Sequence, residues 1–269
     1  MNGLMAGKRG LIMGLANDKS LAWGIAQQLA HAGAELAFTY QGEALAKRVR
    51  PLAESLGSTR MVDCDVSDMA ALDAAFDGLA ADWPTIDFVV HAIGFSDKNE
   101  LRGKYVDTSL DNFLMTMNVS AYSFVAVAKR ARAMMPDGGA LLTLTYYGAE
   151  KVVPHYNVMG VAKAALESSV RYLAADLGSQ GIRVNALSAG PMKTLAASGI
   201  GDFSYILKWN QLNAPLERNV TVEDVGGAGL YLLSDLSNGV TGEVHHVDSG
   251  YHLVGMKNPT APDIAVARD

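Results

Sequence analysis

The chain has 269 residues, of which 49% are hydrophobic and 19% are charged, and its formal net charge is −6. This composition excludes an intrinsically disordered chain, and the acidic balance argues against a nucleic-acid surface, which needs clustered Lys and Arg. The first residues lack the apolar stretch of a signal peptide, and no run approaches the roughly 18 apolar residues of a membrane span. We therefore expect a globular cytoplasmic protein without stable membrane association.

Short apolar runs alternate with longer amphipathic segments along the chain, which is the pattern of βαβ units. These runs predict seven strands, at residues 9–13, 35–40, 60–66, 86–93, 140–146, 183–189 and 243–248. The runs are apolar throughout, as expected of strands buried on both faces of a sheet. The sequence therefore predicts an α/β fold with a doubly wound, seven-stranded parallel sheet and helices on both faces.

No Pro/Ser-rich linker, low-complexity tract or repeat divides the chain, so a single domain over residues 1–269 is predicted. Residues 193–215 are small at the start and apolar at the centre, as expected of a lid over an apolar substrate. An ordinary surface helix is the alternative for this segment. The tail after Met256 is expected to be a surface arm or frayed, and Cys64 is expected to be buried rather than reactive.

The segment GLANDKSLAWG follows the first strand and opens a helix at Leu21. Backbone N–H groups at a helix N-terminus suit a pyrophosphate. Gly14 permits a tight turn, Ser20 is expected to cap the helix and to donate to phosphate, and Gly24 is expected to let the helix lie close to the sheet. Because the spacing departs from G-x-G-x-x-G, an ordinary Ser-capped helix is the alternative.

Open parallel sheets bind ligands beyond the carboxyl ends of their strands. Three such ends carry groups suited to ribose, adenine and a second ribose, in that order: Gln41; Asp65 with Val66; Ile93 with Gly94. From residue 20 through residue 46 there is no Lys or Arg, and Glu43 lies close to Gln41. A 2′-phosphate would therefore lack a cation, and NADH is the predicted cofactor.

The stretch YYGAEKVVPHYNVMGVAK ends at Lys163 and resembles the active-site region of the short-chain dehydrogenase/reductase family. That family usually has a tyrosine four residues before the lysine and a serine seventeen before it, where this chain has Met159 and Tyr146. Tyr156 instead precedes the lysine by seven residues. With CDVSD, HAIGF and VNALSAGPMKTLAASGI, this spacing resembles the bacterial enoyl-[acyl-carrier-protein] reductases that use NADH, over residues 7–250.

The resemblance implies a Rossmann-like fold and a role for each matching residue. Tyr156 would be the catalytic tyrosine, Lys163 would anchor the cofactor, and Tyr146 would be a second active-site tyrosine. Ser96 would contact the substrate, and the nicotinamide would be lined by Met192, Thr194, Leu195 and Ala196. The substrate would be a trans-2-enoyl thioester, on acyl carrier protein or on coenzyme A; only Lys193 and Lys208 are basic in the expected lid, so the sequence leaves the thiol open.

Helix geometry offers a reason for the spacing of Tyr156 and Lys163. Seven helical residues rise about 10 Å, and four rise about 6 Å. A ketone is reduced at the carbon that carries its oxygen, whereas an enoyl thioester receives hydride at C3 and develops charge on the oxygen at C1. The stabilising hydroxyl must then stand farther from the nicotinamide. A carbonyl reductase, a non-catalytic NAD-binding regulator, and tyrosines that only fill the core are the alternatives.

No metal site is predicted, because the histidines lack ligand spacing: His245 and His246 alternate across one strand, and His91, His155 and His252 stand alone. The helices that follow Asp111 and Tyr156 carry apolar residues on more than one face, which predicts association between copies. The residues concerned are Phe124, Val125, Val127, Val161, Leu166, Val170 and Leu173. The family resemblance makes that assembly a homotetramer.

Overall fold

The computed structural model describes residues 3–264, apart from the side chains of Ala196 and Ser198. One parallel sheet contains seven strands in the order β3-β2-β1-β4-β5-β6-β7. These strands are β1 (Arg9–Met13), β2 (Glu35–Tyr40), β3 (Met61–Asp63), β4 (Phe88–His91), β5 (Gly139–Thr145), β6 (Ile182–Ala189) and β7 (Val244–Val247). The chain starts at the centre, proceeds to one edge and returns to build the other half, so the strand order reverses between β1 and β4. Such a reversal opens a crevice at the carboxyl ends of the two strands.

All seven predicted strands are present, but three are shorter than the apolar runs suggest, of which β7 lacks one residue at each end. β3 ends at Asp63, whose carboxylate accepts a hydrogen bond from the Gly42 N–H at 2.9 Å. Asp65 then accepts from the backbone N–H of Ser67 at 2.8 Å, a turn that ends sheet pairing. Strand β4 covers only the central four residues of the run at 86–93.

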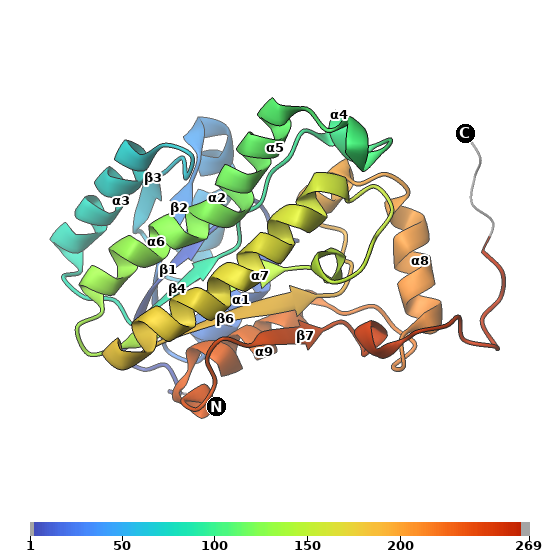
Figure 1. The fold of residues 1–269 in the computed structure, drawn as a ribbon. Coiled ribbons are helices and arrows are strands. Elements are labelled where there is room, and N and C mark those ends of the chain that lie inside the picture. The colour runs from blue at the N-terminus through green and yellow to red at the C-terminus, as the bar shows by residue number, and fades with distance from the viewer. Residues whose placement is uncertain (1–2, 265–269) are drawn as a thin grey trace.

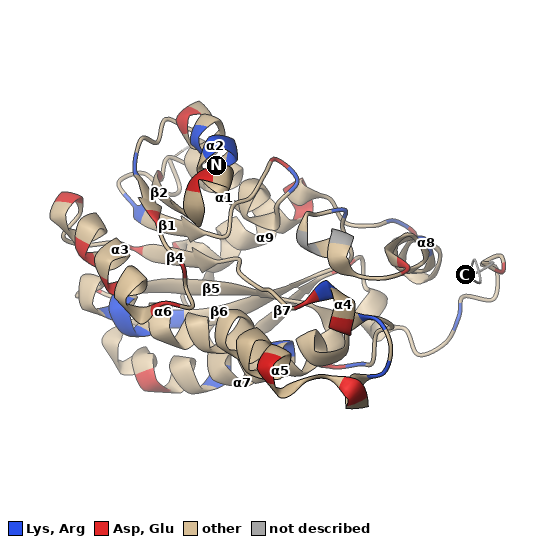
Figure 2. Ribbon diagram, turned by 90° about the horizontal axis from the view of Figure 1, so that it is seen from above, with Lys and Arg blue, Asp and Glu red and all other residues tan. Residues whose placement is uncertain are grey.

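Helices cover both faces of the sheet, which gives the three layers seen in Figures 1 and 2. One face carries α3 (Met69–Asp82), α5 (Leu110–Met117), α6 (Ser123–Ala131) and α7 (Asn157–Leu177). The other carries α1 (Leu21–His31), α2 (Gly42–Ser55) and α9 (Val222–Leu233). The short α4 (Lys98–Leu101) and α8 (Phe203–Asn213) lie at the carboxyl end of the sheet (Figure 1). Within residues 3–264, no helix is long and apolar enough to cross a membrane.

Neighbouring residues of the central strands contribute to different apolar clusters. Leu11 packs with Phe124 and Leu166 on one side of the sheet, and Ile12 packs with Ile25 on the other. This two-sided burial explains why the strands read as continuous apolar runs. Cys64 is 5% exposed, and burial raises the pKa of its thiol to about 11, which confirms the buried placement.

Gly24 contacts a helix rather than the sheet. A Cβ at this position would lie 2.1 Å from the carbonyl oxygen of Val222, at the start of α9. Gly226 makes the matching approach from α9, because its Cβ would lie 2.4 Å from the carbonyl oxygen of Gly24. The prediction that Gly24 brings α1 close to the sheet is therefore wrong, since its missing side chain brings α1 and α9 together.

The predicted association surface is corrected in the same way. Phe124, Val127, Leu166 and Val170 are fully buried against the sheet of their own protomer, so they are not available to a second copy. The sheet covers more of α6 and α7 than the sequence pattern suggests. Of the predicted residues, Val161 is exposed, and so are further apolar side chains of this region: Leu110, Leu114, Tyr122 and Tyr172.

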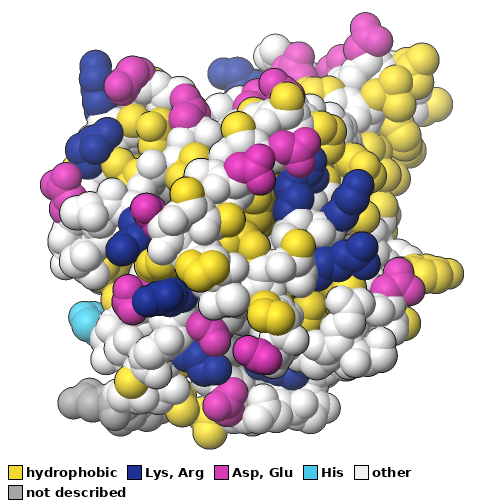
Figure 3. All heavy atoms as spheres, turned by 90° about the vertical axis from the view of Figure 1, so that its left-hand side faces the viewer, with side chains coloured by type: hydrophobic (Ala, Val, Ile, Leu, Met, Phe, Trp, Pro, Cys, Tyr) yellow, Lys and Arg dark blue, Asp and Glu magenta, His cyan; other side chains and the backbone are white. Residues whose placement is uncertain are grey.

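The amino ends of the strands form a surface of mixed charge, on which Lys and Arg lie among Asp and Glu (Figure 3). Lys8 pairs with Asp87 at 3.2 Å. Arg9 and Arg60 approach the ring of the buried Trp83, with their guanidinium carbons 5.6 and 4.7 Å from its centre. Charged side chains at this end therefore serve packing, and the candidate site lies at the opposite end.

Candidate active site

The predicted site residues follow the carboxyl ends of six strands, so the parallel sheet brings them to one edge. Gly14 comes directly after β1, and Gln41 directly after β2. Asp65 follows β3, Ile93 follows β4, and Tyr146 follows β5. The segment with Met192, Thr194, Leu195 and Ala196 follows β6.

The turn after β1 requires glycine at its first position. Gly14 has a φ of 92°, and a Cβ there would lie 2.1 Å from the carbonyl oxygen of Ala92. The chain then leads to Leu21, the first residue of α1, where backbone N–H groups are unpaired by the helix. The close approach to Ala92 therefore leaves no room for a side chain at Gly14, and the N-terminus of α1 that follows is the kind of site that suits a pyrophosphate.

Ser20 does not cap α1 with its side chain, so that part of the prediction is wrong. Its hydroxyl accepts hydrogen bonds from the N–H groups of Ala16 and Asn17, at 3.2 and 3.0 Å. The same hydroxyl donates to the Asn17 side chain at 3.3 Å. Ser20 therefore stabilises the turn, because its hydroxyl bonds the backbone N–H groups of the turn instead of those of the helix.

Gln41 and Asp65 meet although they are far apart in sequence. The Gln41 side-chain amide donates to the Asp65 carboxylate at 2.8 Å. Hydrogen bonds from Ser67 to the same carboxylate hold the pKa of Asp65 below its usual range, so the group is charged. Val66 beside it is buried. An anionic pair therefore lies at the end of β2 and β3, where a 2′-phosphate would be repelled.

Lys163 lies between the ends of two strands. Its side chain is 7% exposed, and its Nζ atom donates to the carbonyl oxygen of Leu144 at 2.8 Å and lies 3.5 Å from that of Ile93. Burial lowers the pKa of this lysine to about 8, while the negative charge of Glu167 acts in the opposite direction. The ammonium is therefore held at the carboxyl ends of β4 and β5, and it remains charged near neutral pH.

Tyr156 stands immediately before α7 rather than inside it, because the helix begins at Asn157. The residues on either side have positive φ, 59° at His155 and 37° at Asn157, so the chain turns sharply into the helix. Tyr156 itself keeps a helical backbone conformation. The helix expected to carry both Tyr156 and Lys163 therefore begins one residue after Tyr156 and contains Lys163.

The two candidate tyrosines pack against each other. Their ring centres lie 5.1 Å apart at an interplanar angle of 75°, an edge-to-face contact. Gly148 makes room for the pair, because a Cβ there would lie 2.3 Å from a ring carbon of Tyr156. Burial raises the pKa of both Tyr146 and Tyr156, so each hydroxyl keeps its proton and is able to donate a hydrogen bond to a ligand. Apolar residues around them form a small separate cluster: Leu101, Phe113, Val153, Val158, Met159 and Ile200.

Ser96 is held by α5 rather than by the tyrosines. Its hydroxyl accepts from Thr116 at 2.9 Å and lies 3.3 Å from the side-chain oxygen of Asn112, to which it donates. The neighbouring Phe95 is exposed, and Ser120 bonds both the N–H and the C=O of that residue. The loop after β4 therefore presents Phe95 outward and turns the Ser96 hydroxyl inward.

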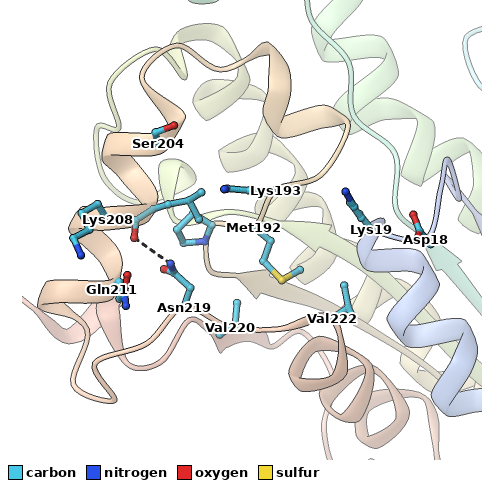
Figure 4. Close-up of a pocket in the computed structure, with 12 residues that line it drawn as sticks. Asp18, Lys19, Met192, Lys193, Ser204, Lys208, Gln211, Asn219, Val220 and Val222 are labelled. Atoms are coloured by element: carbon cyan, nitrogen blue, oxygen red, sulfur yellow. Dashed lines mark hydrogen bonds between the residues drawn. The ribbon is translucent and has the colours of Figure 1, made fainter. Parts of the chain in front are cut away.

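A cavity of about 560 Å³ lies between α8, the turn before α1 and the start of α9 (Figure 4). Met192 and Lys193 line it from the segment after β6, and Lys208 lines it from α8. Lys19 and Asp18 contribute from the turn before α1, so three lysines and one aspartate are among the residues that line this space. Thr194 accepts a hydrogen bond from the Ala197 N–H at 3.1 Å and so anchors the turn in which Ala196 stands.

No group of three or more His, Cys, Asp or Glu within the described residues has an arrangement that could hold a metal ion. His91 is completely buried between Thr143 and Ser123, with its ring nitrogens 3.0 and 2.8 Å from their hydroxyl oxygens. Burial, with a smaller effect from Lys163, lowers the pKa of His91 to about 3, so this ring is a neutral core residue.

The family model described as "Enoyl-(Acyl carrier protein) reductase" matches residues 14–252. The chain is a member of this reductase family. A relative from Rhizobium meliloti (strain 1021), "Enoyl-[acyl-carrier-protein] reductase [NADH] 1", is 70% identical over 100% of this chain and 98% of its own length.

Two solved reductase structures have the same fold. That of Anaplasma phagocytophilum, in complex with NAD, has a TM-score of 0.94 and 62% identity, and covers 98% of this chain and 99% of its own. That of Bacillus cereus, with NADP+ and indole naphthyridinone, has a TM-score of 0.93 and 52% identity, and covers 95% of this chain and 100% of its own.

Sequence reasoning on this reductase missed residues that support the site rather than face it. Gly148 makes room for the Tyr156 ring, and Thr145 and Glu167 bond each other beside Lys163. One signal for Glu167 was available, because an acidic residue four positions after a lysine lies on the same helical face. The glycine has no such signal, since its role depends on a contact across the loop.

Proposed function

We propose that this chain is an NADH-dependent enoyl-[acyl-carrier-protein] reductase, which reduces the carbon–carbon double bond of trans-2-enoyl thioesters in fatty acid elongation. The observation that carries the proposal is the buried Tyr156 seven residues before Lys163, with the ring of Tyr146 packed against it. The names of the relatives support the same activity.

The side chains fit hydride addition to an enoyl thioester. NADH supplies the hydride when bound. As hydride reaches C3, negative charge develops on the thioester oxygen, and Tyr156 donates a hydrogen bond to that oxygen. Because burial raises the pKa of this tyrosine, its proton is retained over the working pH range. Tyr146 orients the thioester, Lys163 holds the hydride donor in place, and a solvent proton completes C2.

The residues at the carboxyl edge fit a dinucleotide. The turn at Gly14 leaves no room for a side chain, as expected where backbone must approach a pyrophosphate. The Gln41–Asp65 pair suits a ribose with free hydroxyls. We assign NADH binding to Gly14, Ser20, Leu21, Gln41, Asp65, Val66, Ile93, Lys163, Met192, Thr194, Leu195 and Ala196, and substrate contact to Tyr146 and the loop of Ser96.

The activity is tested by NADH oxidation with crotonyl and longer enoyl thioesters, compared with the matched ketones and 3-ketoacyl thioesters. We expect oxidation with the enoyl thioesters and none above background with the carbonyl compounds. Oxidation with ketones alone would establish the carbonyl reductase instead. No oxidation with either class, together with intact NADH binding, would favour a non-catalytic regulator.

We expect kcat/KM to be higher with NADH than with NADPH. The anionic Gln41–Asp65 pair lies where a 2′-phosphate would be placed, and no Lys or Arg occurs between residues 20 and 46 to neutralise it. The Bacillus cereus neighbour was solved with NADP+, so the preference needs a direct measurement on this chain. Steady-state kinetics with each cofactor provide this measurement. A preference for NADPH would mean that the ribose-binding role given to Gln41 at the end of β2 is wrong.

We propose that residues 193–215 form a lid on a single domain and that acyl carrier protein approaches beside it. Three lysines around the cavity at α8 suit the acidic surface of such a carrier. Lys208→Glu is therefore expected to raise KM for a carrier-bound enoyl substrate and to leave KM for a short coenzyme A thioester nearly unchanged. Equal changes for both substrates, or none, would contradict this docking site.

We propose that the enzyme is a homotetramer. Exposed apolar side chains of α5 and α7 support association, among them Leu114 and Tyr172. Light scattering at micromolar concentration is expected to give four times the protomer mass. A monomer mass under these conditions would rule the assembly out.

A further inference from the structure

Two neighbouring residues at the end of β5 bond two side chains on one face of α7. The carbonyl oxygen of Leu144 accepts from Lys163 Nζ at 2.8 Å. The hydroxyl of Thr145, the next residue, donates to the Glu167 carboxylate at 2.6 Å. Because Tyr146 follows directly, these two bonds join Lys163 and Glu167 of α7 to the strand end that leads into the active-site loop.

Glu167 is an unusual residue for its place. Only 6% of it is exposed, and a buried carboxylate is costly unless charges or hydrogen bonds compensate it. Burial raises the pKa of Glu167, and Glu150 acts in the same direction. His246 on β7 and Arg171 on α7 act in the opposite direction. The charge of Glu167 in turn acts on Lys163 and on Tyr156. Lys163 lies one helical turn before Glu167, which brings the two side chains to the same face.

We propose that Glu167 is a positioning residue of this reductase, whose carboxylate is the counter-charge that keeps buried Lys163 protonated and oriented at the carboxyl ends of β4 and β5. The role of Lys163 toward the cofactor rests on the proposed function. The charge coupling between Lys163 and Glu167 does not, since it belongs to the protein without any ligand.

The electrostatic balance gives the direction of the effect. Burial lowers the pKa of Lys163 to about 8, and Glu167 opposes that change. Removing the negative charge leaves burial unopposed, so Lys163 would lose its proton at a lower pH. Below both midpoints the parent and a variant without this charge have the same protonated lysine. At pH values between the two midpoints, Lys163 stays mostly protonated in the parent and is mostly deprotonated in the variant.

Glu167→Gln removes the charge, preserves the shape and leaves an oxygen that can accept from Thr145. The direct readout is an NMR titration of the Lys163 side chain in the ligand-free protein labelled with ¹⁵N-lysine, the signal being assigned through its loss in Lys163→Met. We expect the midpoint near pH 8 to fall by about one unit in the variant. Glu54→Gln, on the exposed face of α2, is the matched control and should leave the midpoint unchanged.

A reciprocal measurement keeps the inference testable if Glu167→Gln does not fold. Coupling acts equally in both directions, so Lys163→Met must raise the midpoint of the Glu167 carboxyl, followed by ¹³C NMR. An unchanged Lys163 midpoint in Glu167→Gln, or an unchanged Glu167 midpoint in Lys163→Met, overturns the proposal. A shifted Lys163 midpoint with NADH affinity unaltered at every pH supports the coupling and contradicts only the cofactor role of Lys163.

Discussion

A Tyr156→Phe variant is expected to bind NADH as the parent does and to reduce an enoyl thioester at least about tenfold more slowly, the usual cost of one donor to a developing oxyanion. The substitution keeps the buried ring and its edge-to-face contact with Tyr146, so the fold is preserved. Only the hydroxyl is lost, and its effect should appear in kcat. Turnover of crotonyl thioester and NADH titration by fluorescence measure the two quantities separately.

Tyr147→Phe is the matched control for this experiment. Its ring packs edge-to-face on Tyr251, and its hydroxyl donates only a long bond of 3.4 Å to the carbonyl oxygen of His252. We expect nearly parental turnover from this variant. Equal losses in Tyr147→Phe and Tyr156→Phe, or no loss in the latter, would contradict the role given to Tyr156. Tyr146→Phe separates orientation of the thioester from simple lining of its pocket, since only the former requires the hydroxyl.

Lys163→Ala is expected to weaken NADH binding by about tenfold or more, since a hydrogen bond from a charged group contributes roughly 1.5–3 kcal/mol. The variant also leaves the Leu144 carbonyl oxygen without its donor, so a melting temperature must accompany the binding curve. In the parent, burial lowers the pKa of Lys163 to about 8, so NADH affinity should be complete below that pH and decline above it.

Lys151→Ala, at an exposed position in the loop before α7, controls for the loss of a lysine from this region. We expect it to bind NADH with parental affinity. Parental affinity in Lys163→Ala as well would remove the lysine from the cofactor site. A loss of turnover at saturating NADH, without a change in affinity, would instead place Lys163 in the chemical step.

The arrangement of the sheet could be predicted because its signals are local. Each strand is a short apolar run, and a parallel sheet places the residues that follow its strands at one edge, so Gly14, Gln41 and Tyr146 were brought together by topology alone. The end of β3 could not be predicted, because it depends on the Asp63 side chain reaching Gly42 of another segment.

The details of the site depend on contacts that the sequence does not show. Ser20 occupies the N-cap position of a helix, but its hydroxyl accepts hydrogen bonds from two N–H groups of the preceding loop instead of from the helix. The start of α7 is delayed to Asn157 by left-handed residues that are not glycine, which no pattern indicates. The Thr145–Glu167 bond joins a strand end to a helix 22 residues later, so only the folded chain shows it.

Transfer of deuterium from NADH labelled at the reactive C4 position tests the central claim most directly. The enzyme is incubated with labelled cofactor and an enoyl thioester, and the product is analysed by mass spectrometry and NMR. If Tyr156 and Lys163 act as described, the label appears at C3 of a saturated thioester and a solvent proton appears at C2. Label on a carbinol carbon, with the double bond intact, would contradict enoyl reduction and establish carbonyl reduction in its place.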